Sequence, residues 1–271
     1  MIRVAAAAKQ VAQHYDFGGT TFCLRSTDKE FLQLASRRYG EFAVEQGADF
    51  DLSYQVISEA PSREAEILAS FEITPRFEVQ GESLVLEGPG FTASVDFTQR
   101  RAEFCGPRSS YPIDLSLRHI LSRLHPIPLV VHGATLEAGG RAWWMTGPSG
   151  CGKSTLAGLL PEFALCDELS AVRLGSDSVR LHSLPFWHGR QGFGELQGIF
   201  VIEHGLENRR VRLPATKAVQ TLTEQIVWPL GDLEATTRCF ELLVDLAARV
   251  PVWRLPFRPT REVWDLIEKA A

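Results

Sequence analysis

The first hundred residues alternate apolar and polar positions over short runs. The alternation is clearest in residues 48–58, 76–90 and 91–104, and a period of two is typical of antiparallel strands with one solvated face. Two glycine-containing segments, QGES at residues 80–83 and EGPG at residues 87–90, predict turns between strands. The pattern therefore predicts a β-rich N-terminal region.

Two helices are expected beside these strands. Residues 28–42 place apolar side chains at helical spacing, which predicts a short helix packed against the sheet. Residues 113–124 repeat that spacing, with Asp114 as the expected N-cap. Two prolines follow and end the helical pattern. We therefore assign residues 1–125 to an α+β N-terminal region and residues 126–271 to a second domain.

The second half of the chain combines strands and helices. Apolar runs on either side of a Gly139–Gly140 turn predict two strands, and the second leads into a glycine-rich loop and a helix over residues 153–163. Thr260 is the expected cap of the last helix. The predicted fold class is mixed α/β. Further strands are expected near residues 172–184, 198–203 and 250–257, and further helices over residues 237–250 and 260–270.

Composition and charge narrow the functional class. The chain has 271 residues, 45% hydrophobic and 23% charged, which is enough for a substantial core. A net charge of -5 without a long basic run gives no attraction for nucleic acid or for an anionic membrane surface. The apolar stretch within residues 1–17 is too short to span a membrane and is expected to be a frayed start or a first strand.

Cysteine usage points to a compartment. The chain has five cysteines, an odd number without metal-type spacing, which indicates thiols in a reducing environment and hence the cytoplasm. They are Cys23, Cys105, Cys151, Cys166 and Cys239.

GPSGCGKST, at residues 147–155, matches the phosphate-loop pattern G-x-x-x-x-G-K-[ST]. It follows an apolar strand and precedes a helix, which is the context that the pattern requires. Glycines allow backbone amides to turn toward phosphate oxygens, and the helix N-terminus adds a partial positive charge. We therefore expect ATP and Mg²⁺ as cofactors. The expected nucleotide contacts are Gly147, Ser149, Gly150, Cys151, Gly152, Lys153, Ser154 and Thr155.

Individual residues of the loop have separate expected roles. Lys153 is expected to reach the β and γ phosphates and Ser154 to ligate Mg²⁺, whereas Thr155 is expected to pack. Cys151 is interpreted as a small residue that fits the loop, with an oxidisable thiol as the alternative.

An acidic pair ends the next apolar segment. Asp167 and Glu168 follow residues 163–166, and Asp167 lies fourteen positions after Lys153. A carboxylate at this place can bind Mg²⁺ or accept a proton from an attacking hydroxyl. The short spacing favours a kinase-like arrangement over an ATPase motor. The alternative is that the pair only ends a strand and caps a turn.

Residues 130–168 resemble the catalytic domain of HPr kinase/phosphorylase and of the wider group of HPr-kinase-like proteins. The shared frame is a His-Gly pair ending a strand, a glycine turn, the phosphate loop, and an acidic pair one helix later. The resemblance covers residues 128–270. It implies a phosphoenolpyruvate-carboxykinase-like nucleotide-binding core and Mg²⁺-dependent phosphorylation of a serine hydroxyl by ATP.

The resemblance also assigns roles to single residues. It implies that His132 is the active-site histidine and Asp167 the proton-transferring carboxylate, with Lys153 acting in catalysis at the phosphates. Metal ligands are expected from Ser154, Asp167 and Glu168, although the family usually has an aspartate where this chain has Glu168. Without the resemblance, a histidine such as His132 is more often a structural side chain.

Two departures from the family shape the expected activity. The chain lacks a segment of the EIRGLGI type, which is associated with the phosphorylase reaction, so a reversible phosphorylase is not expected. The N-terminal half is similar to that of HPr-kinase-like proteins encoded beside peptide-modification machinery. The expected partner is therefore a protein or peptide that bears a serine, and the N-terminal half is a candidate for its recognition. The family forms rings, which is compatible with a homo-oligomer.

A later loop supplies a candidate cation. Residues 182–195 combine proline, glycines and aromatics, as in a mobile loop over a site, and Arg190 is a candidate partner for the transferring phosphoryl group. An ordinary surface loop is the alternative. Arg254, Arg258 and Arg261 are further candidates. Three other functions stay open on the residues alone: a nucleotide-dependent binding module, a plain ATPase and a small-molecule kinase.

Overall fold

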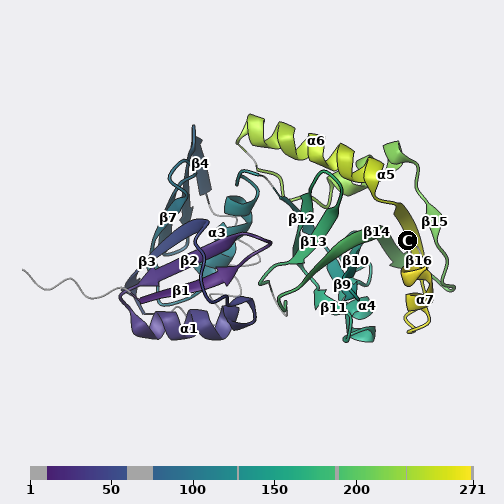
Figure 1. Cartoon of the computed structure of the whole chain (residues 1–271), viewed down its shortest axis with the longest axis horizontal. Helices are drawn as coiled ribbons and strands as arrows, with labels where there is room; N and C mark the ends of the chain where they lie inside the picture. The colour runs from purple at the N-terminus through teal and green to yellow at the C-terminus, as the bar shows by residue number, and fades with distance from the viewer. Residues whose placement is uncertain (1–10, 60–75, 127, 187–188, 230, 270–271) are drawn as a thin grey trace, which may run out of the picture. The chain divides into compact units, whose positions relative to one another are not determined.

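The computed structural model describes residues 11–59, 76–126, 128–186, 189–229 and 231–269. The expected frayed start or first strand lies in part outside these residues. The chain divides into two compact units, one up to residue 117 and one from residue 118 onward, and residues 17–19 belong to the second. Each unit is built on its own mixed β-sheet (Figure 1). The protein is therefore mixed α/β with two mixed sheets.

The first unit holds a seven-stranded sheet in the order β1-β2-β3-β7-β6-β5-β4. The expectation of antiparallel strands is confirmed for β4 to β7. It is wrong for β3, because β2 pairs in parallel with β3, and β3 with β7. A helix joins β2 to β3 as a crossover, and the β4–β6 meander separates β3 from β7 in the chain, so both pairs can run parallel. The strands are β1 (Val11–Asp16), β2 (Thr21–Ser26), β3 (Phe50–Ser58), β4 (Arg76–Gln80), β5 (Ser83–Gly88), β6 (Phe91–Asp96) and β7 (Arg101–Pro107).

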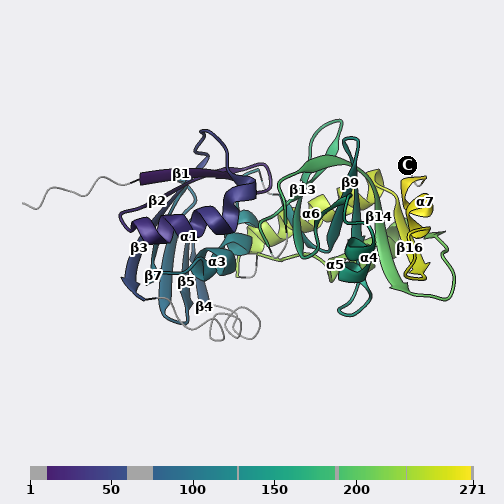
Figure 2. The same cartoon turned by 90° about the horizontal axis from the view of Figure 1, so that it is seen from below.

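The helix expected near residue 30 is confirmed as α1 (Lys29–Tyr39), followed by a 3₁₀ turn, η1 (Gly40–Phe42). Figure 2 shows α1 lying along the strands of the sheet, beside α3 (Tyr111–Leu121). The Phe31 ring stacks on Tyr54 of β3 at 4.0 Å between centroids, so this face of the sheet is covered by aromatic packing.

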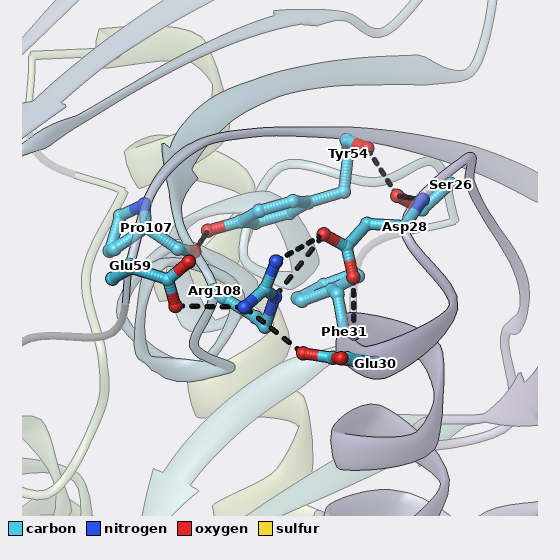
Figure 3. A network of polar contacts seen from close by, with 8 residues as sticks. All are labelled: Ser26, Asp28, Glu30, Phe31, Tyr54, Glu59, Pro107 and Arg108. Carbon is cyan, nitrogen blue, oxygen red and sulfur yellow. Dashed lines mark hydrogen bonds and ion pairs between the residues drawn. The ribbon is translucent and has the colours of Figure 1, made fainter.

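An ion-pair network holds the start of α1 (Figure 3). Asp28 accepts a hydrogen bond from the Phe31 amide at 2.8 Å, which caps the helix. Arg108 donates to the same carboxylate at 3.0 Å and to Glu59 at 2.8 Å, and it pairs with Glu30 at 3.0 Å. Burial would raise the pKa of Asp28, but the Phe31 and Arg108 hydrogen bonds outweigh burial and lower it.

Asp114 does not cap the second helix, contrary to expectation. It lies within the first turn of α3, and its carboxylate accepts a hydrogen bond from the Tyr39 hydroxyl at 2.9 Å and pairs with Arg38 at 3.3 Å. A tertiary contact to α1 therefore takes the place of a local cap. Burial raises the pKa of Asp114 despite these partners.

The second unit holds a nine-stranded sheet with helices on both faces. The strand path is β11-β9-β10-β14-β13-β12-β8, with β16 added beside β14 and β15 beside β16. The strands are β8 (Leu129–His132), β9 (Ala134–Ala138), β10 (Arg141–Thr146), β11 (Ala164–Cys166), β12 (Leu169–Leu174), β13 (Val179–Ser183), β14 (Phe193–His204), β15 (Val211–Arg212) and β16 (Val252–Phe257). The helices are α4 (Lys153–Leu159), α5 (Ala215–Thr223), α6 (Leu233–Arg249) and α7 (Val263–Glu268).

Strand β10 lies at the centre of this unit and contributes to both cores. Ala142 and Trp144 pack in the cluster that contains the buried faces of α5 and α6. Trp143 and Met145 point to the other face, in the cluster that contains α4 and α7. The helices accordingly lie on the two sides of the sheet (Figure 1). The end of β10 is therefore fixed between two packed layers, where a functional loop can be held precisely in place.

Two expectations about the later helices fail. Helix α7 begins at Val263 without a side-chain cap, and Thr260 donates to the Glu262 carboxylate at 3.3 Å instead. Helix α5 was not expected; it follows Pro214, which supplies no capping side chain. Among the described residues, no helix has the length and apolar character needed to cross a membrane.

Candidate functional site

The glycine-rich segment forms the connection from β10 to α4, as expected. Gly147 leaves the strand where a Cβ atom would lie 2.9 Å from the Ile202 carbonyl oxygen. Gly152 precedes α4 with φ of 104°, and a Cβ there would lie 3.0 Å from the Phe257 ring. The backbone of β14 therefore leaves no space for a Cβ atom at Gly147, and at Gly152 the positive φ and the close Phe257 ring both disfavour a side chain, which accounts for the glycines.

Lys153 is the first residue of α4, and its side chain is folded over the loop. The Nζ atom donates to the Gly147 carbonyl at 2.8 Å and to the Pro148 carbonyl at 3.1 Å, and it lies 3.7 Å from the Cys151 Sγ atom. Only 8% of Lys153 is exposed. Among the described residues its hydrogen-bond partners are uncharged, and a nearly buried ammonium without a bonded carboxylate is suited to bind an anion.

Other loop residues differ in exposure. Ser149, Gly150, Ser154 and Thr155 are exposed, so the expected packing of Thr155 is wrong, whereas Cys151 is buried. His204, at the end of β14, lies 2.8 Å from the Gly150 carbonyl through its Nε2 atom. This contact was not expected from the sequence, because the histidine lies in an otherwise ordinary strand end.

Ser154 and Asp167 lie on one pocket with a volume of about 410 Å³. The strand β11 ends at Cys166, as the apolar run predicted, and delivers Asp167 to this pocket. The Asp167 Oδ1 atom is shielded from solvent and has no hydrogen-bond partner among the described residues. Because buried polar atoms are normally hydrogen-bonded, we expect a bound ligand to supply a hydrogen-bond donor or a cation to this oxygen.

Arg190 lines the same pocket. Its guanidinium donates to the Ala164 carbonyl at 3.0 Å and to the Glu162 carbonyl at 3.1 Å. These bonds anchor Arg190 to Glu162 and to the first residue of β11, and they leave guanidinium N–H groups for other acceptors. Trp187 and His188 of the expected mobile loop lie outside the described residues.

His132 and Glu168 form a second polar pair. The His132 Nε2 atom lies 3.7 Å from the Glu168 Oε1 atom, and both side chains are partly exposed. The pairing of β8 with β12, in which His132 is opposite Leu169, brings the two residues together. His132 is held at its backbone, because its amide donates to Gln225 at 2.8 Å and its carbonyl accepts from the Thr146 hydroxyl at 2.8 Å.

Arg118 is a candidate that the sequence did not single out. It lies on α3, and its Nε atom is buried without a hydrogen-bond partner among the described residues. Burial lowers the pKa of Arg118, and the Glu168 carboxylate opposes this effect. One arginine on a mostly apolar helix face was the only signal in the sequence.

The other arginines are engaged elsewhere. Arg254 pairs with Glu203 at 2.8 Å, and Arg261 pairs with Glu162. Arg258 does not line the pocket, and its backbone amide donates to the Asn208 side chain at 2.8 Å. Of the arginines named from the sequence, only Arg190 lines the pocket.

The oxygen atoms at this pocket are of the type that binds Mg²⁺ in nucleotide sites. Among the described residues, no group of three or more His, Cys, Asp or Glu side chains is placed to hold a metal ion. Mg²⁺ in nucleotide sites takes one or two carboxylates together with phosphate oxygens and water. Ser154 and the unpartnered oxygen of Asp167 are compatible with such a site, and Glu168 lies next in the chain, turned toward His132.

Comparisons with known proteins give likenesses only among solved structures. Models of protein families and the curated proteins gave no match. Among solved structures, the HPr(Ser) kinase/phosphatase from Coxiella burnetii matches 52% of this chain and 92% of its own length, with 12% identity and a TM-score of 0.29. The resemblance to a kinase/phosphatase is structural and distant.

Proposed function

We propose that this protein is a Mg²⁺- and ATP-dependent kinase that phosphorylates a serine hydroxyl of a protein or peptide. The observation that carries the proposal is the unpartnered Asp167 oxygen in one pocket with Ser154, next to a glycine loop that ends in the nearly buried Lys153. A P-loop core of the phosphoenolpyruvate-carboxykinase type, within residues 126–271, is part of the proposal.

The loop residues bind and orient the nucleotide. ATP with Mg²⁺ supplies the phosphoryl group and neutralises the charge that develops on it. Lys153 would exchange its bonds to the Gly147 and Pro148 carbonyls for phosphate oxygens, while the backbone amides of the loop after Pro148 add further donors. Ser154 and an acidic residue, Asp167 or Glu168, would hold the metal.

Asp167 acts on the acceptor. Its carboxylate accepts the hydroxyl proton of the serine while the serine oxygen forms a bond to the γ-phosphorus, and the bond from that phosphorus to the bridging oxygen breaks to leave ADP. His132 orients the acceptor or the γ-phosphate, with the Glu168 carboxylate 3.7 Å from its Nε2 atom. Catalysis of this type depends on positioning and charge stabilisation.

The free cysteines bear on the cellular compartment in which the reaction takes place. All five cysteines are free, and four of them are buried. This usage supports a reducing compartment, and we include the cytoplasm in the proposal.

The proposal is tested without knowledge of the acceptor. Binding of Mg²⁺-ATP and acceptor-free turnover are measured for the wild type, Lys153→Ala and Asp167→Asn. The matched controls are Lys217→Ala and Asp177→Asn, since both residues are exposed and lie away from the loop. We expect Lys153→Ala to lose binding, and Asp167→Asn to bind normally and to lower turnover by about 10²–10⁴-fold.

The outcomes separate the functional classes. Tight binding with slow, Lys153-dependent turnover supports a kinase, and detection of phosphoserine on a candidate peptide completes the test. Rapid turnover without acceptor indicates an ATPase. Nucleotide-dependent binding of a partner without phosphorylated product indicates a binding module. Absence of Mg²⁺-ATP binding by the wild type contradicts the proposal.

A further inference from the structure

The pocket that contains the polar residues Ser154 and Asp167 has mostly apolar walls. Most of its lining is apolar and comes from α4, from the turn after it and from β11: Ala157, Gly158, Pro161, Ala164 and Leu165. Its volume of about 410 Å³ lies within the range of about 300–1,000 Å³ that small-ligand pockets have. The pocket is therefore larger than a single hydroxyl group requires.

The polar groups of the pocket limit what can occupy it. The Asp167 oxygen needs a donor, and Arg190 has N–H groups left after its two bonds to backbone carbonyls. A ligand that satisfies both presents a hydroxyl to Asp167 and a carbonyl oxygen to Arg190, and it places an apolar group against Leu165. A serine in a peptide, with an aliphatic neighbour, has all three features.

A polar small molecule would leave the apolar walls in contact with polar groups. Burial of an aliphatic side chain gains free energy in proportion to the apolar area that it removes from water. The walls therefore discriminate against sugars and similar acceptors, which cannot supply that area.

We propose that this pocket is an acceptor subsite, and that it binds the aliphatic side chain of a residue adjacent in sequence to the serine that is phosphorylated. This inference rests on the proposed kinase function and narrows its substrate to peptides or protein segments with an apolar residue beside the serine.

Gly158 offers a way to fill the pocket without disturbing the fold. A Cβ atom built on Gly158 meets nothing within 4 Å, and the residue lies in α4 with ordinary helical backbone. Gly158→Ala and Gly158→Leu are therefore expected to be at least as stable as the wild type, because glycine is a poor helix former. Gly40 provides the matched control: it also has open space and a right-handed conformation, but it lies in the first unit.

The experiment uses a set of short, capped peptides with a single serine. The residue before or after the serine is Leu, Ala, Asp or Lys. Transfer of phosphate from ATP is measured for the wild type, Gly158→Ala, Gly158→Leu and Gly40→Leu. Binding of the same peptides with alanine in place of serine is measured by fluorescence polarisation, and binding of Mg²⁺-ATP is measured in the same samples.

We expect the wild type and Gly40→Leu to prefer a leucine neighbour over a lysine neighbour by tenfold or more in transfer, and to bind the alanine-containing leucine peptide. Gly158→Leu is expected to lose this preference and this binding while it retains Mg²⁺-ATP, with Gly158→Ala intermediate.

Each contrary result has a definite meaning. A leucine preference that persists in Gly158→Leu overturns the inference and leaves the kinase intact. Binding of Mg²⁺-ATP with no transfer to any peptide also overturns it, and directs attention to small-molecule acceptors. Absence of Mg²⁺-ATP binding by the wild type overturns the proposed function and the inference together.

Discussion

His119 makes the second unit sensitive to acid. It lies in the last turn of α3 and is 7% exposed. Burial lowers the pKa of His119 from 6.5 to about 3, and the neighbouring charges of Arg118 and Arg123 act in the same direction. In the folded protein the imidazole is therefore neutral at pH 5, whereas in the unfolded chain it is protonated.

The sign and size of the effect follow from proton linkage. Between pH 6.5 and about pH 3 the unfolded state binds one proton more than the folded state, so stability falls as the pH is lowered through this window. The stabilising contribution is fully present above pH 6.5. At pH 5, about 1.5 pH units below the unfolded pKa, the loss is about 2 kcal/mol, because each unit is worth about 1.4 kcal/mol.

Replacement of His119 by leucine tests this reasoning, since leucine does not titrate. Urea unfolding is followed between pH 5 and pH 7.5 by the fluorescence of Trp143 and Trp144, which are buried in the same unit. We expect the wild type to lose about 2 kcal/mol more than His119→Leu over this range. His182, with a pKa lowered to about 4 mainly by burial, retains its own contribution in both proteins. Equal pH dependence in the two proteins would refute the argument.

Two further pairs of substitutions test the loop and the first unit. Gly152→Ala places a side chain at φ of 104° and 3.0 Å from the Phe257 ring, and is expected to destabilise the loop by about 1–3 kcal/mol and to weaken Mg²⁺-ATP binding in a titration. Gly150→Ala, where the space is open, should cost less; equal losses would show that contact with Phe257 is unimportant. Asp28→Ala removes the cap on the Phe31 amide together with the ion pair to Arg108, whereas Asp28→Ser removes the ion pair but retains a capping oxygen; the alanine variant should therefore be less stable than the serine variant by about 1 kcal/mol in urea unfolding. Equal stability of the alanine and serine variants would contradict the capping role.

Local features of the fold could be predicted from the sequence. The period-two alternation located β5 and β6, and helical spacing located α1, because each pattern reports one buried face. The connection from β10 to α4 could also be predicted, since the motif states both the loop and its flanking elements.

Features that depend on contacts between residues distant in sequence could not be predicted. The parallel pairing of β3 with β7 joins strands separated by a three-stranded meander, and no local pattern specifies it. Asp114 has the residue type of a cap, yet it bonds to Tyr39 across the unit. The same limit applies at the site, where the pairing of β8 with β12 places His132 beside Glu168. Spacing alone left the roles of Asp167 and Glu168 open.

The pocket gives a physical reason to expect slow reaction with water. A water molecule can donate a hydrogen bond to the Asp167 oxygen as a serine hydroxyl does, so this carboxylate alone does not distinguish the two. Water gains nothing from the walls formed by residues such as Leu165 and Pro161, whereas an aliphatic side chain beside the serine is stabilised there. If the acceptor binds as we propose, binding energy from a group that does not react positions the hydroxyl. Acceptor-free turnover should then stay slow in Gly158→Leu as well, because the substitution removes the advantage of the peptide without improving the position of water.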